Sequence, residues 1–294
     1  MKTRKSKELI VTLDSGLYGP KNFKESLALT YNENVKFDKF LIHKQVESIQ
    51  SFSNKYVHQR SCQPYKVFPT SKEYDLKPYL RMMPSGEKAN LFNILANRRS
   101  GRSYSSYFIS LNELALLCHY GYGITGESYS EETEAMLRFR TVPSAGALYP
   151  LELYIYLNTS MLPCGIYHYS PNKSVLELVK EEDYMEYLRE NLVAEPFVDL
   201  QHCSCVFFIT SFFERVLIKY GDRGYRFILQ EVGFLTQNIS LLAELLGLNS
   251  CVLGSYVDDN IDRILVADGT FESVQNVIVV GKNKEVQNDN VTSK

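Results

Sequence analysis

A cluster of cations occupies residues 98–102, where Arg98, Arg99 and Arg102 surround Ser100 and Gly101. Three guanidinium groups and a hydroxyl within five residues, just where a helix is expected to end, can form a forked site for a phosphate dianion. The alternative is a solvated basic patch that stabilises the end of the helix. The residue types alone leave both interpretations open.

A second segment that could bind a ligand runs from residue 140 to residue 150 and precedes an apolar stretch. Between its two prolines the residues are small, so the backbone of a rigid loop can approach a flat ligand closely. The candidate ligand-binding residues here are Pro143, Ser144, Ala145, Gly146 and Ala147. The alternative is an ordinary turn into a strand. Ser144 does not lie in a G-x-S-x-G elbow, which argues against a hydrolase nucleophile.

Two later segments add further candidates. Lys219 and Tyr220 stand side by side before the longest helical segment, where burial would lower the pKa of the lysine and make a proton acceptor. The alternative is an ordinary surface pair. Gly254 and Ser255 follow an apolar strand, and a backbone N–H there can face a ligand. Near the C-terminus, Lys282 and Lys284 add two cations.

Several classes of protein are disfavoured. No Walker A sequence is present, which argues against a P-loop. The net charge of −2 predicts no general attraction to nucleic acid or to an anionic membrane. Cys203 and Cys205 lie on one face of an apolar strand and are interpreted as packed thiols, so no metal site is predicted. Without a secretory segment or a membrane span, we expect a soluble, cytoplasmic protein.

The hydrophobic pattern predicts mixed secondary structure. Helices are expected at 37–52, 90–98, 110–120, 181–192 and 222–246, and strands at 151–157, 165–169, 175–179, 203–210, 251–257 and 274–280. Ser110 and Glu113 form a capping-box pattern, and Gly121 is expected to end that helix in a left-handed conformation. The helix at 222–246 is apolar on nearly every face, which predicts burial in a core or a subunit interface.

The chain is expected to have three parts. Residues 1–85 form a polar, poorly defined N-terminal extension that is a candidate region for contact with a partner or peptide. Residues 86–284 form the main domain, and residues 285–294 form a polar tail. Segregated helices and short strands favour an α+β fold over a βαβ series.

The order of the motifs resembles one family. The series R-R-S-x-R, R-x-x-P-S-A-G-A-L-Y-P-L-E-L-Y, G-I-Y-H-Y, K-Y-G-D-R-G-Y-R-F and Q-N with A-E-L-L-G-L resembles the streptolysin S-type and microcin-type azoline dehydrogenases. These are a branch of the nitroreductase-like flavoproteins, and the resemblance covers residues 85–281. Ala147 and Tyr149 stand where general nitroreductases tend to carry Asn and Gln, which favours the peptide-modifying branch. Gly101 stands where a bulkier residue is usual.

The resemblance implies an α+β sandwich, with a central buried helix, that binds FMN at a homodimer interface. It implies that Arg98 and Ser100 hold the phosphate and that Arg102 lies near the pyrimidine edge of the ring. Residues 143–147 would line the isoalloxazine. Gly254 and Ser255 would approach N5 and O4, and Lys282 or Lys284 would add a phosphate contact. Lys219 and Tyr220 correspond to the catalytic pair of that branch.

The expected function is the oxidation of thiazolines or oxazolines to thiazoles or oxazoles in a ribosomally made precursor peptide. A cyclodehydratase complex would form the rings, and dioxygen would reoxidise the flavin. The main alternative is an NAD(P)H-dependent nitro- or quinone reductase. A third hypothesis is a flavin-stabilised scaffold that assembles the cyclodehydratase complex without catalysis.

Overall fold

The computed structural model describes residues 27–36, 54–81, 83–85, 90–131 and 134–284. The chain separates into two units, residues 1–45 and residues 46–294. The described part of the first unit contains one helix, α2 (Leu27–Asn34). The predicted helix at 37–52 lies outside the described residues, as does the predicted tail at 285–294.

The second unit is built on an eight-stranded sheet in the order β1-β7-β6-β5-β8-β10-β2, with β9 also paired to β10. All of these pairs are antiparallel. The strands are β1 (Glu73–Asp75), β2 (Tyr104–Ser105), β5 (Leu151–Leu157), β6 (Gly165–Ser170), β7 (Val175–Lys180), β8 (Cys205–Phe212), β9 (Asn249–Leu253) and β10 (Glu272–Asn283). The six strands expected from the sequence are therefore all present, and the α+β prediction is confirmed.

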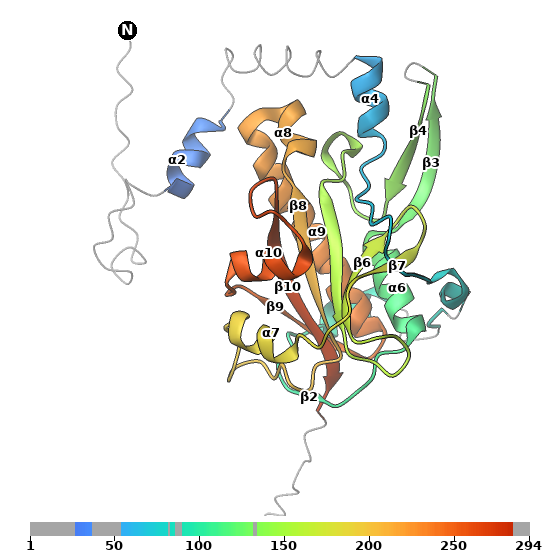
Figure 1. The fold of residues 1–294 in the computed structure, drawn as a ribbon, viewed down its shortest axis with the longest axis vertical. Helices are drawn as coiled ribbons and strands as arrows, with labels where there is room; N and C mark the ends of the chain where they lie inside the picture. The colour runs from blue at the N-terminus through green and yellow to red at the C-terminus, as the bar shows by residue number, and fades with distance from the viewer. Residues whose placement is uncertain (1–26, 37–53, 82, 86–89, 132–133, 285–294) are drawn as a thin grey trace, which may run out of the picture. The chain divides into compact units, whose positions relative to one another are not determined.

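Both faces of the sheet are covered, because side chains alternate between two cores. On β5, Leu153 and Ile155 pack in the core shared with α6 (Leu111–Tyr122) and α9 (Gly224–Leu245). Tyr154 and Tyr156 point the other way, into the core shared with α7 (Met185–Asn191) and α10 (Asp258–Leu265). Figure 1 places α7 and α10 on the left of β10 and α6 on the right.

The smaller elements contain several differences from the expected pattern. The hairpin of β3 (Ile124–Ser130) and β4 (Ala135–Arg140) forms a separate sheet that the sequence did not suggest. Among the described residues the remaining α-helices are α4 (Lys55–Ser61), α5 (Leu91–Asn97) and α8 (Glu214–Tyr220). Because α8 ends at Tyr220 and α9 begins at Gly224, the helix predicted from 222 is preceded by a separate one. Part of the expected N-terminal extension also joins the main sheet, since β1 pairs with β7.

The capping box on Ser110 and Glu113 is confirmed, but the predicted stop at Gly121 is wrong. Helix α6 continues to Tyr122, and Gly123 caps it with an ordinary negative φ of −76°. Gly121 instead faces α9, where an added Cβ would lie 3.4 Å from Ile239. The small residue therefore allows the two helices to approach closely. At the far end of α9, Gly247 has a φ of +70°, as expected for a glycine that ends a helix.

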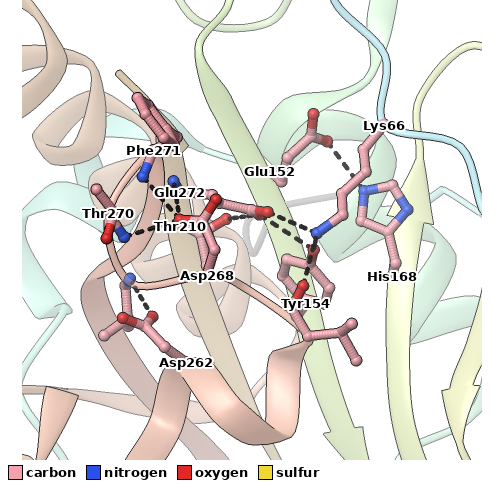
Figure 2. Close-up of polar contacts among 12 residues, drawn as sticks. Lys66, Glu152, Tyr154, His168, Thr210, Asp262, Asp268, Thr270, Phe271 and Glu272 are labelled. Carbon is pink, nitrogen blue, oxygen red and sulfur yellow. Dashed lines mark hydrogen bonds and ion pairs between the residues drawn. The ribbon is translucent and has the colours of Figure 1, made fainter. Parts of the chain in front are cut away.

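A layer of polar side chains lies inside the second core (Figure 2). Lys66 Nζ lies 2.5 Å from Glu272 Oε2 and 2.6 Å from the Tyr154 hydroxyl. The Thr210 hydroxyl donates to Glu272 Oε1 at 2.7 Å. The Glu272 side chain is 3% exposed, so its charge is compensated almost entirely by protein groups. This ion pair attaches the segment around residue 66 to the sheet.

Replacing Lys66 with Met should therefore destabilise the fold by about 3 kcal/mol, because it leaves the buried Glu272 carboxylate without its cation. Lys55 provides a matched control, since its ion pair with Glu134 is more than half exposed on both sides. Lys55→Met should cost less than about 1 kcal/mol. Denaturant unfolding of the two variants measures the difference, and equal costs would contradict a stabilising role for the buried pair.

Candidate functional site

The cationic cluster lies at one end of the sheet. Helix α5 ends at Asn97, and Arg98 caps it through a backbone N–H that donates to Ile94 O. Ser100 then forms a parallel bridge with Ser250 of β9, and the Gly101 N–H donates to Ser250 O at 3.1 Å. The end of β10 lies beside the same segment, because Lys282 is paired with Ser105 of β2. The structure thus brings the two predicted groups of cations to the same edge.

Within this cluster the cations have different surroundings. Arg99 Nη1 donates to Ala96 O at 2.9 Å and to Arg98 O at 2.8 Å, so this guanidinium contacts the end of α5. For Arg99, this contact matches the alternative interpretation of the cluster, a basic patch that stabilises the end of the helix. Arg98 is half-buried and Arg102 is exposed. Gly101 is required by packing, because an added Cβ would lie 2.5 Å from Asn249 Cβ.

The loop at residues 143–149 has an unusual backbone. Gly146, Ala147 and Tyr149 have φ values of +64°, +54° and +44°. A left-handed conformation at a non-glycine residue is uncommon and persists where surrounding contacts enforce it. Those contacts are present: the Tyr149 N–H donates to Ser144 Oγ at 2.9 Å, and the Ala147 N–H donates to Ser144 O at 3.1 Å.

Lys219 and Tyr220 lie against this loop. A Cβ built on Gly146 would lie 2.8 Å from the Tyr220 hydroxyl and 2.9 Å from Lys219 Nζ. The structure therefore brings together the loop and the Lys–Tyr pair, which are more than 70 residues apart in the sequence. Burial lowers the pKa of Lys219 and raises the pKa of Tyr220. The Lys219 amine therefore loses its proton more readily than the Tyr220 phenol, which stays protonated.

Gly254 and Ser255 follow β9 directly, and both are exposed. An added Cβ on Gly254 would meet no atom within 4 Å, so its backbone is open to a ligand. Ser250, beside the cations, lies on the same strand. At about 3.3 Å per residue, the four residues from Ser250 to Gly254 span roughly 13 Å. One strand thus connects the cationic edge with the open glycine.

A buried carboxylate, Glu231, lies behind the loop and was not among the residues predicted from the sequence. Glu231 of α9 is 2% exposed and accepts a hydrogen bond from the Tyr122 hydroxyl at 2.9 Å. Burial raises the pKa of Glu231 to about 7. A glutamate among Ile228, Val232 and Leu235 on one apolar helix face was the signal that could have identified it.

Arg140 and Arg215 hold the other side of the same loop. The Arg140 guanidinium lies 4.4 Å from the centre of the Tyr122 ring and 4.9 Å from that of Tyr149. Arg215 Nη1 donates to Tyr149 O at 3.2 Å, and Arg215 Nη2 lies 2.7 Å from Glu152 Oε1. Arg215 of α8 thus holds the loop directly, and Arg140 connects it to Tyr122 of α6.

The carboxylate that pairs with Arg215 belongs to a buried chain of charged groups. His168 lies between Glu152 and Glu177, at 2.9 Å and 2.8 Å. Burial alone would raise the pKa of Glu152, but Arg215 and His168 hold it at about 2. Burial would likewise lower the pKa of His168, and hydrogen bonds to the two carboxylates raise it instead. The two carboxylates therefore favour the protonated form of His168.

Comparison with known proteins identifies the family of this chain. The family model described as "Nitroreductase family" matches residues 95–282. The chain belongs to the nitroreductase family, a family of oxidoreductases. It is 34% identical over 184 residues to "Putative nitroreductase MJ1384" of Methanocaldococcus jannaschii, a match that covers 62% of this chain and 87% of that protein.

Two relatives are named for peptide processing. The microcin B17-processing protein McbC of Escherichia coli is 32% identical over 140 residues, which covers 44% of this chain and 49% of McbC. The trifolitoxin-processing protein TfxB of Rhizobium leguminosarum bv. trifolii is 27% identical over 180 residues, which covers 60% of this chain and 48% of TfxB. The match therefore spans about half the length of each of these two relatives.

Solved structures share the fold. The crystal structure of a "putative nitroreductase" from Anabaena variabilis has a TM-score of 0.66 and 26% identity, and covers 86% of this chain and 45% of that chain. A chain in the Escherichia coli microcin synthetase McbBCD complex with truncated pro-MccB17 bound has a TM-score of 0.55 and 21% identity. That match covers 85% of this chain and 99% of the McbBCD chain. Within the described part of our protein, no helix is long and apolar enough to cross a membrane.

Glu231 should make the stability of the fold depend on pH. Because its folded pKa is raised from its usual range to about 7, the native state binds an extra proton between about pH 4.5 and pH 7. The Glu231 contribution to the free energy of unfolding therefore falls as the pH rises through that window. Relative to Glu231→Gln, the wild-type protein should lose about 1–3 kcal/mol between these limits. Denaturant unfolding at several pH values measures this, and parallel pH curves for the two proteins would contradict it.

Proposed function

We propose that this protein is an FMN-dependent dehydrogenase that oxidises thiazolines and oxazolines to thiazoles and oxazoles in a ribosomally made peptide. The observation that carries the proposal is the approach of Lys219 and Tyr220 to Gly146. A lysine with a lowered pKa and a protonated tyrosine face the loop that the family resemblance assigns to the isoalloxazine. A dehydrogenation needs a proton acceptor at that position.

The residues at the edge of the sheet fit FMN. Arg98 and Arg102 lie beside the strand that carries Lys282, and a group of guanidinium and ammonium groups suits a phosphate dianion. The open backbone at Gly254 leaves room for the edge of a flat ring. FMN, when bound, supplies the two-electron acceptor that removal of a proton and a hydride requires. Arg98, Ser100, Arg102 and Lys282 are the residues that would hold it.

The Lys–Tyr pair divides the acid and base roles. The Lys219 amine, whose pKa burial lowers, takes the proton from the α-carbon of the azoline. The Tyr220 hydroxyl, whose pKa burial raises, stays protonated and donates a hydrogen bond that orients the ring. Gly146 leaves space for both side chains at the loop surface, where a methyl group would already crowd them.

The peptide substrate and its partners are inferred from the relatives. McbC and TfxB are named for peptide processing, and the McbBCD structure contains a bound truncated pro-peptide. We propose by analogy that a cyclodehydratase complex presents the azoline-bearing peptide and that dioxygen reoxidises the flavin. A cavity of about 420 Å³ between α4 and α8, beside Leu148 and Ile218, offers a place for part of that peptide.

We also propose a homodimer. Helix α9 buries one face in the core but leaves Leu229 and Phe234 46% and 44% exposed, and Phe92 on neighbouring α5 is 80% exposed. Such apolar groups favour burial against a second copy. Light scattering of the flavin-loaded protein should give the mass of two chains, and a monomer with bound flavin would contradict the assembly.

The match to "Putative nitroreductase MJ1384" supports a second candidate, an NAD(P)H-dependent nitro- or quinone reductase. The two functions differ in the electron donor. Rapid bleaching of the flavin by NAD(P)H alone would favour the reductase. Bleaching by an azoline-bearing peptide in the absence of NAD(P)H would favour the dehydrogenase.

Replacing Arg98 with Ala should weaken FMN binding by about 10- to 150-fold, because it removes one charge-assisted contact to the phosphate. Titration of apo-protein with FMN, followed by flavin fluorescence, measures the dissociation constant. Arg263→Ala on α10 is the control and should leave it unchanged. An unchanged constant for Arg98→Ala would move the phosphate site toward Lys282 and Lys284. Release of FAD on denaturation, or failure of the protein to bind FMN, would reject the cofactor assignment.

Lys219→Ala should lower the rate of single-turnover flavin reduction by an azoline peptide by about 10²- to 10⁴-fold, the usual contribution of a positioned base. Lys219→Arg should be equally slow, because a guanidinium stays protonated. Tyr220→Phe should reduce the rate less. The wild-type rate should rise with pH as the Lys219 amine loses its proton.

Flavin content is measured on the same samples, and Lys77→Ala is the exposed control. Wild-type rates in both Lys219 variants would reject the base assignment. If Lys219→Ala loses activity only by losing flavin, the pair belongs to cofactor binding. If the assembled complex still processes the peptide with Lys219→Ala, that result favours the scaffold hypothesis.

A further inference from the structure

We propose that Arg215 is a positioning residue for the reaction: its guanidinium, anchored on the buried Glu152, sets the place of the Lys–Tyr pair against the loop at 143–149. This role rests on the proposed function, because it concerns the geometry around the base assigned there. Arg215 lies on α8, and its side chain is 19% exposed. It acts through Lys219 and does not itself accept the proton.

Helix α8 has little local support of its own. It spans seven residues, and Phe213 at its N-terminus makes no side-chain capping hydrogen bond. Within α8, Val216 is the one buried residue. Helices this short are marginal without tertiary contacts. The position of α8, and with it that of its last two residues, therefore depends on contacts to other elements.

Arg215 and Lys219 are four residues apart, so they lie on one face of α8. At 1.5 Å per residue they are separated by roughly 6 Å along the helix axis. Arg215 Nη1 donates to Tyr149 O at 3.2 Å. Lys219 Nζ lies near Gly146, 2.9 Å from a Cβ built there. The helix thus meets the loop at two points, and a shift at the first moves the second.

Glu152 gives Arg215 a fixed anchor in the sheet. It lies on β5, its side chain is 1% exposed, and each of its carboxylate oxygens contacts a basic side chain. Oε2 lies 2.9 Å from His168 Nε2 (Figure 2), and Oε1 lies 2.7 Å from Arg215 Nη2. Turning the carboxylate away from Arg215 would also break the contact with His168, which is fully buried. The ion pair therefore holds α8 at a defined place on β5.

The shape of the guanidinium matters as well as its charge. One nitrogen of Arg215 is directed to Tyr149 and another to Glu152. Its Cζ also lies 4.5 Å from the centre of the Phe212 ring. A lysine carries the same charge at a single point and has no planar fork. Arg215→Lys should therefore keep a cation near Glu152 but lose the simultaneous contact with the loop.

A direct contact with the peptide is the competing explanation, because Arg215 also lines the cavity between α4 and α8. Glu152 separates the two explanations, since a side chain that is 1% exposed cannot reach a bound peptide. Positioning predicts that Arg215→Lys and Glu152→Gln both lower the limiting rate at saturating peptide. A peptide contact predicts that Arg215→Lys raises the half-saturating peptide concentration and leaves the limiting rate alone.

Single-turnover flavin reduction by an azoline peptide, with flavin content measured on the same samples, gives the first readout. Arg215→Lys and Glu152→Gln should each lower the limiting rate about 10- to 100-fold, the order expected for misplacement of reacting groups. In a Lys219→Ala background, Arg215→Lys should slow the reaction no further than about 2-fold, because Arg215 acts through Lys219. A loss that multiplies with that of Lys219→Ala, or a change in half-saturation alone, would overturn the inference.

Amide hydrogen exchange at Tyr149 gives the second readout and needs no substrate. The Tyr149 N–H donates to Ser144 Oγ at 2.9 Å, so its exchange reports opening of the loop in the full folded protein. Arg215→Lys should speed this exchange about 10-fold, because the loop loses its hydrogen bond to the guanidinium. Glu152→Gln should have the same effect, because a neutral amide holds the guanidinium less firmly.

Asp262→Asn is the matched control for loss of global stability. Asp262 is a 2% exposed carboxylate on α10 that accepts the Val274 N–H at 2.6 Å, and α10 packs in the other core. This variant should leave the Tyr149 amide unchanged. If Glu152→Gln folds poorly, Arg215→Lys carries the test, because it keeps both charges.

Wild-type exchange at Tyr149 in Arg215→Lys, or equal acceleration in Asp262→Asn, would contradict the positioning role. If the exchange results appear as expected but the wild-type protein oxidises no azoline, the proposed function fails while the link from Arg215 to the loop stands.

Discussion

The site depends on one steric constraint, the absence of a side chain at Gly146. Lys219 and Tyr220 approach its Cα so closely that a methyl group would lie within 3 Å of both polar atoms. The left-handed φ of +64° is also one that glycine adopts readily and other residues rarely do. The contact between the loop and the Lys–Tyr pair therefore exists only because this residue is glycine. Most other features around the site serve to keep the loop in that conformation.

The polar interior explains how a strained loop can persist in an apolar fold. The strand β5 begins two residues after Tyr149 and is fully buried, so the loop has a rigid end. Glu152 on that strand pairs with Arg215 of α8, and Arg215 also binds the carbonyl of Tyr149. The same helix ends in Lys219 and Tyr220. One buried ion pair thus fixes both partners of the Gly146 contact relative to the sheet, which a hydrophobic contact would do less specifically.

The sequence predicted what depends on local pattern. The buried strands and the capping box on Ser110 were recognisable because alternation and cap spacing are written in neighbouring residues. The hairpin of β3 and β4 was missed because no residue of β3 is buried, and an ion pair between Arg138 and Glu127 takes the place of apolar alternation. Gly121 was misjudged because the contact that uses it, with Ile239, is more than 100 residues away.

The distinction between local pattern and long-range contact also applies to the candidate site. Loop 143–147 and the Lys–Tyr pair were each visible as motifs, but their contact arises from the fold and from no local pattern. Glu231 was overlooked because it lies within an apolar helix whose hydrophobic residues dominate the pattern. A carboxylate on a buried helix face must be compensated by hydrogen bonds or remain protonated, and either outcome ties it to a specific neighbour. Here that neighbour is Tyr122, whose ring lies against the Arg140 guanidinium that also contacts the Tyr149 ring.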